Sequence, residues 1–135
     1  MKTSILCARN PKSIEKSLSF LKKGELVAIP TETVYGLAGL FSNIEAQKKI
    51  YSVKNRPLDN PLIAHVSSIQ KACDWIENPS DYEKDLELLA PFFPGPLTVI
   101  FKTHSKMDPE VHAAKTIAFR VPNHFWTLSL LKELK

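Results

Sequence analysis

Apolar residues recur along this chain at two spacings, one typical of helices and the other of strands. The helical spacing first links Ile14, Leu18 and Leu21, which would face the core from one side of a helix. Ser13 is the expected N-cap of that helix, and Gly24 stands where a glycine commonly ends one. The pattern therefore predicts a first helix from Ser13 to just before Gly24.

Four further helices are predicted from the same spacing. Two of them begin at a capping box, in which a serine and a glutamate three residues later bind each other's free backbone N–H groups. The expected starts, with the residues expected to face the core, are Ser42 (Ala46, Ile50, Val53), Ser67 or Ser68 (running to about Ile76), Ser80 (Tyr82, Leu86, Leu89) and Asn123 (Phe125, Leu128, Leu131, Leu134).

Short apolar runs between those helices predict four strands, at 26–29, 62–66, 97–102 and 116–121, with a loop at 30–41. The last strand alternates clearly, because Ile117, Phe119 and Val121 share one face while Thr116, Ala118 and Arg120 share the other. Helices and strands alternate along the chain, which predicts an α/β fold, or α+β with a mixed sheet.

The composition fits one globular domain over residues 1–135. Hydrophobic residues make up 44% and charged residues 24%, which argues against whole-chain disorder. No apolar run is long enough to cross a membrane, and the first residues lack a signal-peptide pattern, so a cytoplasmic protein is expected. Two cysteines and four histidines without ligand spacing predict no protein-held metal site.

The charge is unevenly distributed. The net charge is +4, yet residues 74–87 hold six acids and one base, so the remainder carries 17 bases against 8 acids. A basic surface with one acidic face suits a nucleotide or RNA partner, and a well-solvated protein surface is the other interpretation.

Three places carry candidate chemistry. Residues 30–37 follow a strand and combine glycine with small hydroxyl residues, a pattern that suits either a ligand-binding loop or a structural turn. Lys54 and Arg56 could neutralise phosphates, or could simply stabilise the C-terminal end of a helix. Arg120 lies with Thr116 on one strand face, where the small Ala118 leaves room for a ligand; an internal ion pair is the alternative.

Taken together, these segments resemble the YrdC/Sua5 family of threonylcarbamoyl-AMP synthases. The resemblance runs from about Ile14 to the end of the chain. It rests on four motifs in family order: PTETVYGL at 30–37, Lys54-x-Arg56-Pro57 with Pro61-Leu62, Pro94-Gly95-Pro96-x-Thr98, and IAFRVP at 117–122.

The resemblance implies a twisted mixed sheet with flanking helices and a basic concave groove. It implies an enzyme that makes threonylcarbamoyl-AMP and pyrophosphate from L-threonine, bicarbonate and ATP, with Mg²⁺, for the t6A modification at position 37 of tRNA. Binding of tRNA or double-stranded RNA, and partner proteins of t6A synthesis, are also implied. By family position, the threonine site would hold Thr33, His65 and Arg120, and the ATP site Lys54, Arg56, Asn60 and Thr116. No residue is assigned as a catalytic acid or base.

One motif of the family is not found before Lys135, namely a Ser-x-x-Ala-Asn-x-Ser-Gly-type segment on the next strand. We therefore expect residues 1–135 to lack the C-terminal segment of the domain and to bind ligands with little turnover. Two alternatives remain: a non-catalytic module that binds nucleotide or double-stranded RNA, and a family paralogue with a different reaction.

Overall fold

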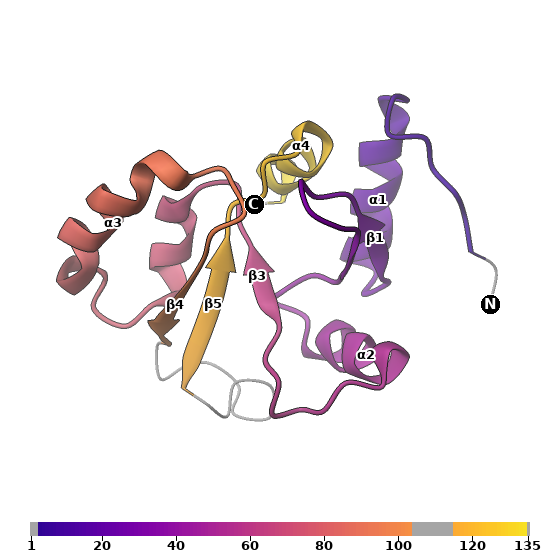
Figure 1. Ribbon diagram of the computed structural model, residues 1–135. Helices are drawn as coiled ribbons and strands as arrows, with labels where there is room; N and C mark the ends of the chain where they lie inside the picture. Colours follow the sequence, from indigo (N-terminus) through magenta and orange to yellow (C-terminus); the bar gives the residue numbers. More distant parts are fainter. Residues whose placement is uncertain (1–2, 104–114, 135) are drawn as a thin grey trace.

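The fold combines two small β-sheets with four α-helices and three short 3₁₀-helices in the residues that the computed structural model describes, 3–103 and 115–134 (Figure 1). In chain order the elements are α1 (Lys12–Lys22), β1 (Val27–Ile29), β2 (Gly36–Ala38), α2 (Ile44–Lys54), β3 (Ile63–His65), η1 (Ile69–Trp75), η2 (Pro79–Tyr82), α3 (Glu83–Leu89), η3 (Ala90–Phe92), β4 (Thr98–Lys102), β5 (Thr116–Arg120) and α4 (Phe125–Glu133). No helix in these two ranges is long and apolar enough to cross a membrane.

The larger sheet is mixed, with β5 in the centre. β3 runs parallel to β5 and β4 antiparallel to it, so the strand order is β3-β5-β4. The register places both His65 and Thr98 opposite Arg120. β1 and β2 form a separate antiparallel pair. A mixed sheet flanked by helices confirms the predicted α/β class.

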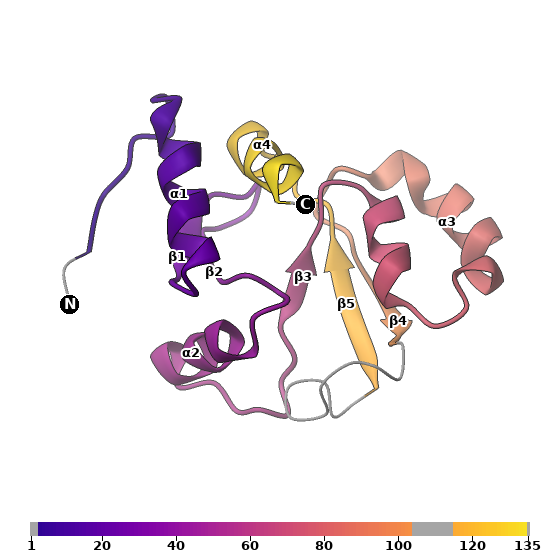
Figure 2. The same ribbon diagram turned by 180° about the vertical axis from the view of Figure 1, so that it is seen from behind.

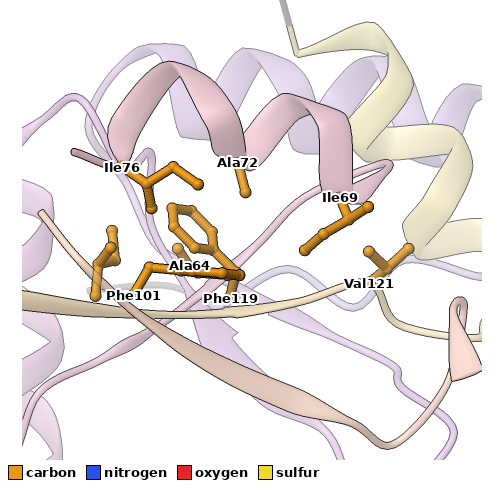
Figure 3. Packing of buried hydrophobic residues seen from close by; sticks show 8 residues of the cluster. Ala64, Ile69, Ala72, Ile76, Phe101, Phe119 and Val121 are labelled. Carbon is orange, nitrogen blue, oxygen red and sulfur yellow. The ribbon is translucent and has the colours of Figure 1, made fainter. Parts of the chain in front are cut away.

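One face of the larger sheet carries the main hydrophobic core. η1 lies across that face, and its Ile69 and Ala72 point toward Phe119 of β5, as Figure 3 shows. Phe101 of β4 and Val121, just after β5, complete the labelled cluster with Ala64 and Ile76. All of these side chains are less than 9% exposed, so the covered face is the apolar one that strand alternation predicted.

A second core joins the N-terminal part of the chain to the C-terminal helix. It consists of Leu21, Ile29, Trp126 and Leu130, from α1, β1 and α4. Figures 1 and 2 both show α1 and α4 side by side, away from η1 and α3. α4 also packs Leu128 against the main core, so this helix contacts both hydrophobic cores.

Of the five expected helix starts, only Ser68 is confirmed, as the N-cap position of η1. Ser13 is a buried residue inside α1, and its hydroxyl accepts a hydrogen bond of 2.8 Å from the indole of Trp126. Asn43 rather than Ser42 caps α2, because its side chain accepts the Ala46 N–H at 3.0 Å. The other two helices begin after Tyr82 and His124 instead of Ser80 and Asn123, without a side-chain cap.

Two helix faces also differ from the expectation. Val53 and Phe125 were expected inward, but they are 65% and 68% exposed. Tyr51 in α2 and Trp126 in α4 are buried in their place. The faces differ because burying the larger side chains of Tyr51 and Trp126 removes more apolar surface from water. Residue spacing along a short helix does not reveal this difference.

The strands follow the prediction closely and the connecting segments less so. All four predicted strands form, each one or two residues shorter than the predicted run at one or both ends. The expected loop at 30–41 contains β2, which pairs with β1. The expected helix at 67–76 is the 3₁₀-helix η1, whose repeat of three residues turns Ile69 and Ala72 to the same side.

The buried contact between Ser13 and Trp126 is testable by mutation. Ser13→Ala leaves the indole N–H of Trp126 without its acceptor, which should lower the free energy of unfolding by about 1–3 kcal/mol. Ser129→Ala is the matched control, because the Ser129 hydroxyl bonds only to a carbonyl of its own helix. Denaturant unfolding of both variants gives the comparison, and equal losses would contradict the role of this contact.

Candidate functional site

The face of the larger sheet opposite the main core presents polar side chains at both of its ends. On β5, Thr116, Ala118 and Arg120 point to this face, while Ile117 and Phe119 point into the core. The first and last of these residues are four positions apart, which corresponds to about 13 Å along a strand. We call this surface the open face.

The middle of the open face is apolar. Ile63 of β3 and Ile100 of β4 lie opposite Ala118, one on each side, and they are 44% and 66% exposed. The open face therefore has a polar end at Thr116, an apolar middle at Ala118 and a second polar end at Arg120.

Arg120 forms an ion pair with Glu32, a residue 88 positions away in the sequence. The Arg120 Nε donates to Glu32 Oε1 at 3.1 Å, and Nη2 donates to the same oxygen. The two side chains are only 13% and 16% exposed. The internal ion pair that the sequence left open as an alternative is therefore present.

Glu32 is held in its ionised form by these contacts. Its burial would by itself raise the pKa, but the hydrogen bond and charge of Arg120 and the backbone N–H of Asn123 outweigh it and lower the pKa of Glu32 below its usual value. A carboxyl group with a lowered pKa is a poor general base.

Thr33 joins Arg120 through its hydroxyl oxygen. Arg120 Nη2 donates to Thr33 Oγ1 at 3.2 Å. The Thr31 hydroxyl gives its hydrogen to the Val34 carbonyl at 2.6 Å, and its oxygen accepts the backbone N–H groups of Thr33 and Val34 at 3.2 and 3.1 Å. The Thr33 hydroxyl, which accepts from Arg120, can therefore still accept one hydrogen bond from a ligand and can also donate one.

His65 stands beside Arg120 on β3. Its Nδ1 lies 3.3 Å from the Ile63 carbonyl, which can only accept, so Nδ1 carries the hydrogen and Nε2 is left as an acceptor. Burial is the largest effect and lowers the pKa of His65; the hydrogen bond to the Ile63 carbonyl opposes it, the positive charge of Arg120 lowers the pKa further, and Glu32 raises it least. His65 is accordingly neutral at pH 7.

Arg120 keeps one group of donors for a ligand. Within the described residues its hydrogen bonds use Nε and Nη2, and Nη1, which is not sealed from solvent, has no partner. This end of the open face thus offers a cationic donor from Arg120 and acceptors from Thr33 and His65. Such a set complements a small molecule that carries a carboxylate together with an amine or hydroxyl group.

Two of the four residues expected at ATP, Arg56 and Asn60, are in direct contact. Arg56, just after α2, donates from Nε to the Asn60 carbonyl at 2.8 Å, and from Nη2 to Asn60 Oδ1 at 2.5 Å and the Pro61 carbonyl at 2.8 Å. Figures 1 and 2 show the chain between α2 and β3 passing the end of the sheet where β5 begins with Thr116. Lys54, the last residue of α2, is exposed.

The structure thus brings Arg56 and Asn60 into direct contact and fixes the Arg56 guanidinium in the loop. A pocket of about 560 Å³ lies against the C-terminal half of α2 and is lined by Lys48, Tyr51, Ser52, Asn55, Arg56 and Leu58. Of the residues expected at ATP, this pocket includes only Arg56. No group of three potential metal ligands is present in residues 3–103 and 115–134.

Glu32 is not among the residues expected at the site from the sequence. A glutamate between two threonines in a loop looks like an ordinary exposed residue, and its partner is distant in the sequence. The one indication in the sequence is that Arg120 lies on a half-buried strand, where an unpaired charge is costly, so an acidic partner is expected.

Charge is divided between the two sides of the larger sheet. The acids of residues 74–87 lie on η1, η2, α3 and the segments joining them, and they are exposed. This layer covers the face with the main core. The open face carries Lys102 and Arg120 instead, the latter paired with Glu32.

Comparison with known proteins agrees with this architecture. A sequence model of the Sua5/YciO/YrdC family, described as "Telomere recombination", matches residues 19–135. The chain belongs to this family. Among Sua5/YciO/YrdC proteins, it is 41% identical over 126 residues to the threonylcarbamoyl-AMP synthase of Bacillus subtilis, covering 92% of this chain and 36% of that protein. It is 38% identical to that of Pyrococcus abyssi, covering 88% and 35%.

Solved structures of the Sua5/YciO/YrdC family share the fold. Pyrococcus abyssi Sua5 complexed with L-threonine superposes with a TM-score of 0.80 at 34% identity, covering 96% of this chain and 37% of that one. Escherichia coli YciO gives a TM-score of 0.77 at 20% identity, covering 93% and 60%, which supports the fold alone. The chain spans little more than a third of the length of the curated relatives from Bacillus and Pyrococcus.

The protonation of His65 can be measured directly. Because burial and Arg120 disfavour the imidazolium, its NMR titration midpoint should fall below 6.5, and Arg120→Met should raise that midpoint. Since the pKa is lowered on folding, the free energy of unfolding should decrease as the pH falls below 6.5. His65→Gln assigns the resonance, and a midpoint above 6.5 in the wild type would refute this environment.

Proposed function

We propose that the chain is the ligand-binding part of an L-threonylcarbamoyladenylate synthase. The observation that carries the proposal is the Arg120 end of the open face, where one cationic donor stands beside the acceptors of Thr33 and His65. L-Threonine offers a carboxylate to Arg120, and an amine and a hydroxyl to the two acceptors. Relatives named threonylcarbamoyl-AMP synthase and the L-threonine complex of Pyrococcus abyssi Sua5 support it.

ATP would bind at the other end of the open face. Lys54, Arg56 and Thr116, with the amide of Asn60, are the groups that would meet its phosphates. Arg56 suits this role because its Nε and Nη2 donors are used within the loop, and among the described residues Nη1 has no partner. Mg²⁺ would be held chiefly through the triphosphate, since no cluster of three protein ligands occurs in the described ranges.

The reaction places two charged reactants end to end. The amine of L-threonine takes up CO₂ from bicarbonate to give a carbamate. A carbamate oxygen then attacks the α-phosphorus of ATP, and pyrophosphate leaves. The chain would contribute by holding the carboxylate at Arg120 and the phosphates at Arg56, so that catalysis here is orientation and charge stabilisation.

The product would serve tRNA modification in the cytoplasm, with tRNA and the other proteins of t6A synthesis as partners. A non-catalytic module that binds nucleotide or double-stranded RNA is the second candidate. Its support is the separation of charge, with exposed acids on the covered side of the sheet and cations on the open face. Pyrophosphate release that depends on both L-threonine and bicarbonate distinguishes the enzyme from the module.

Two substitutions separate the proposed ligand ends. Arg56→Ala should weaken ATP binding more than L-threonine binding, and Arg120→Ala should do the reverse, each by about 2–5 kcal/mol. Arg120→Lys keeps the charge that Glu32 requires, and so shows whether the guanidinium fork itself matters. Isothermal titration of both ligands measures this, and equal losses for both ligands in both variants would refute the assignment.

RNA binding should depend on the open face and be weakened by the acidic layer. Phosphate contacts make such binding fall steeply with salt concentration. Reversing the charge of Asp81, Asp85 and Glu87 should therefore strengthen binding of double-stranded RNA at low salt, as measured by fluorescence anisotropy. Unchanged affinity at low salt would contradict this long-range effect.

A further inference from the structure

Glu32 connects three segments that meet at the Arg120 end of the open face. It lies in the loop after β1, it binds the last residue of β5, and it accepts a backbone N–H just before α4. We propose that Glu32 is a positioning residue, which holds the guanidinium of Arg120 by its Nε–Nη2 edge and so presents Nη1 to the ligand carboxylate. This inference rests on the proposed function.

Both carboxylate oxygens of Glu32 are engaged. Oε1 receives the two hydrogen bonds from Arg120, and Oε2 receives the Asn123 N–H at 3.0 Å. The loop that carries Glu32 is also anchored to α4, because the Thr127 hydroxyl donates to the Pro30 carbonyl at 2.5 Å. Glu32 is thus fixed from both sides, and its carboxylate fixes Arg120 in turn.

Glu32 could instead be a competing anion that a ligand must displace. The geometry argues against that, since Nη1 of Arg120 has no partner in the described part of the chain while Glu32 is bound. A carboxylate can reach Nη1 without breaking the ion pair. It would then meet an arginine that cannot rotate, and the cost in side-chain entropy on binding would be smaller.

Glutamine in place of Glu32 tests this with little change in volume. Its amide has one oxygen and one NH₂ group, whereas both Arg120 and Asn123 are donors at this place. Either orientation of the amide therefore sets its NH₂ group against one of these donors, and the charge is lost as well. Glu25→Gln is the matched control, because Glu25 only approaches Lys49 at 3.7 Å, with both side chains about half exposed.

The experiment titrates L-threonine, L-threoninamide and ATP into the wild type, Glu32→Gln and Glu25→Gln. Glu32→Gln should weaken L-threonine binding by about tenfold, with ATP binding unchanged. L-Threoninamide lacks the carboxylate, so its affinity should be the same in all three proteins. In an Arg120→Lys background, Glu32→Gln should cause no further loss of L-threonine affinity, because the fork that Glu32 positions is already gone.

Other results would overturn the proposal. Tighter or unchanged L-threonine binding in Glu32→Gln would make Glu32 a competing anion or a bystander. Equal weakening of L-threonine and ATP, or a loss that persists in the Arg120→Lys background, would make its role merely structural. If the wild type binds no L-threonine, the proposed function fails, while the ion pair can still be tested by the NMR signal of the Arg120 Nε–H. That signal should be protected from exchange in the wild type and lose its protection in Glu32→Gln.

Discussion

The charge of Arg120 on the central strand is the constraint around which the rest of this structure is arranged. β5 buries Ile117 and Phe119 against η1, so every second residue must face the other way. That direction places a guanidinium on a largely buried strand, where a lone charge is costly. Glu32 provides the opposite charge. Its contacts with Arg120 and with the Asn123 N–H hold the loop after β1 and the segment before α4 at the end of the sheet.

Arg120 and Arg56 are held in the same way. Arg120 uses Nε and Nη2 for Glu32 and Thr33, and Arg56 uses Nε and Nη2 for Asn60 and Pro61. In both arginines, Nη1 makes no hydrogen bond to a described residue. Such fixed cationic donors suit negatively charged groups.

The helices contribute mainly by covering the apolar face of the larger sheet, which leaves the open face to solvent. η1 and α3 cover the apolar face and carry the exposed acids, so an anionic ligand is repelled from that side and finds cations on the other. α4 has a different role, because it packs against both cores and its start supplies the Asn123 N–H to Glu32. The site is therefore coupled to packing between the two ends of the chain.

The sequence by itself determined the strands and which side chains share a strand face. Strand alternation separates Ile117 and Phe119 from Thr116 and Arg120 without reference to any other part of the chain, since its period of two depends only on local backbone geometry. The family motifs likewise named Thr33 and His65, which lie beside Arg120 in the structure, and Arg56 and Asn60, which contact each other. What the sequence left open for Arg120 was an ion pair or a ligand site; the structure shows the ion pair, and Nη1 has no partner among the described residues.

Only the tertiary structure decided the helix caps, the buried helix faces and the partner of Arg120. Asn43 rather than Ser42 caps α2, and Trp126 rather than Phe125 turns inward, because packing against the rest of the molecule outweighs small differences in local preference. Glu32 and Arg120 are 88 residues apart, and no local pattern encodes a contact over that separation. Their meeting depends on how two sheets and α4 come together, which is a property of the folded chain.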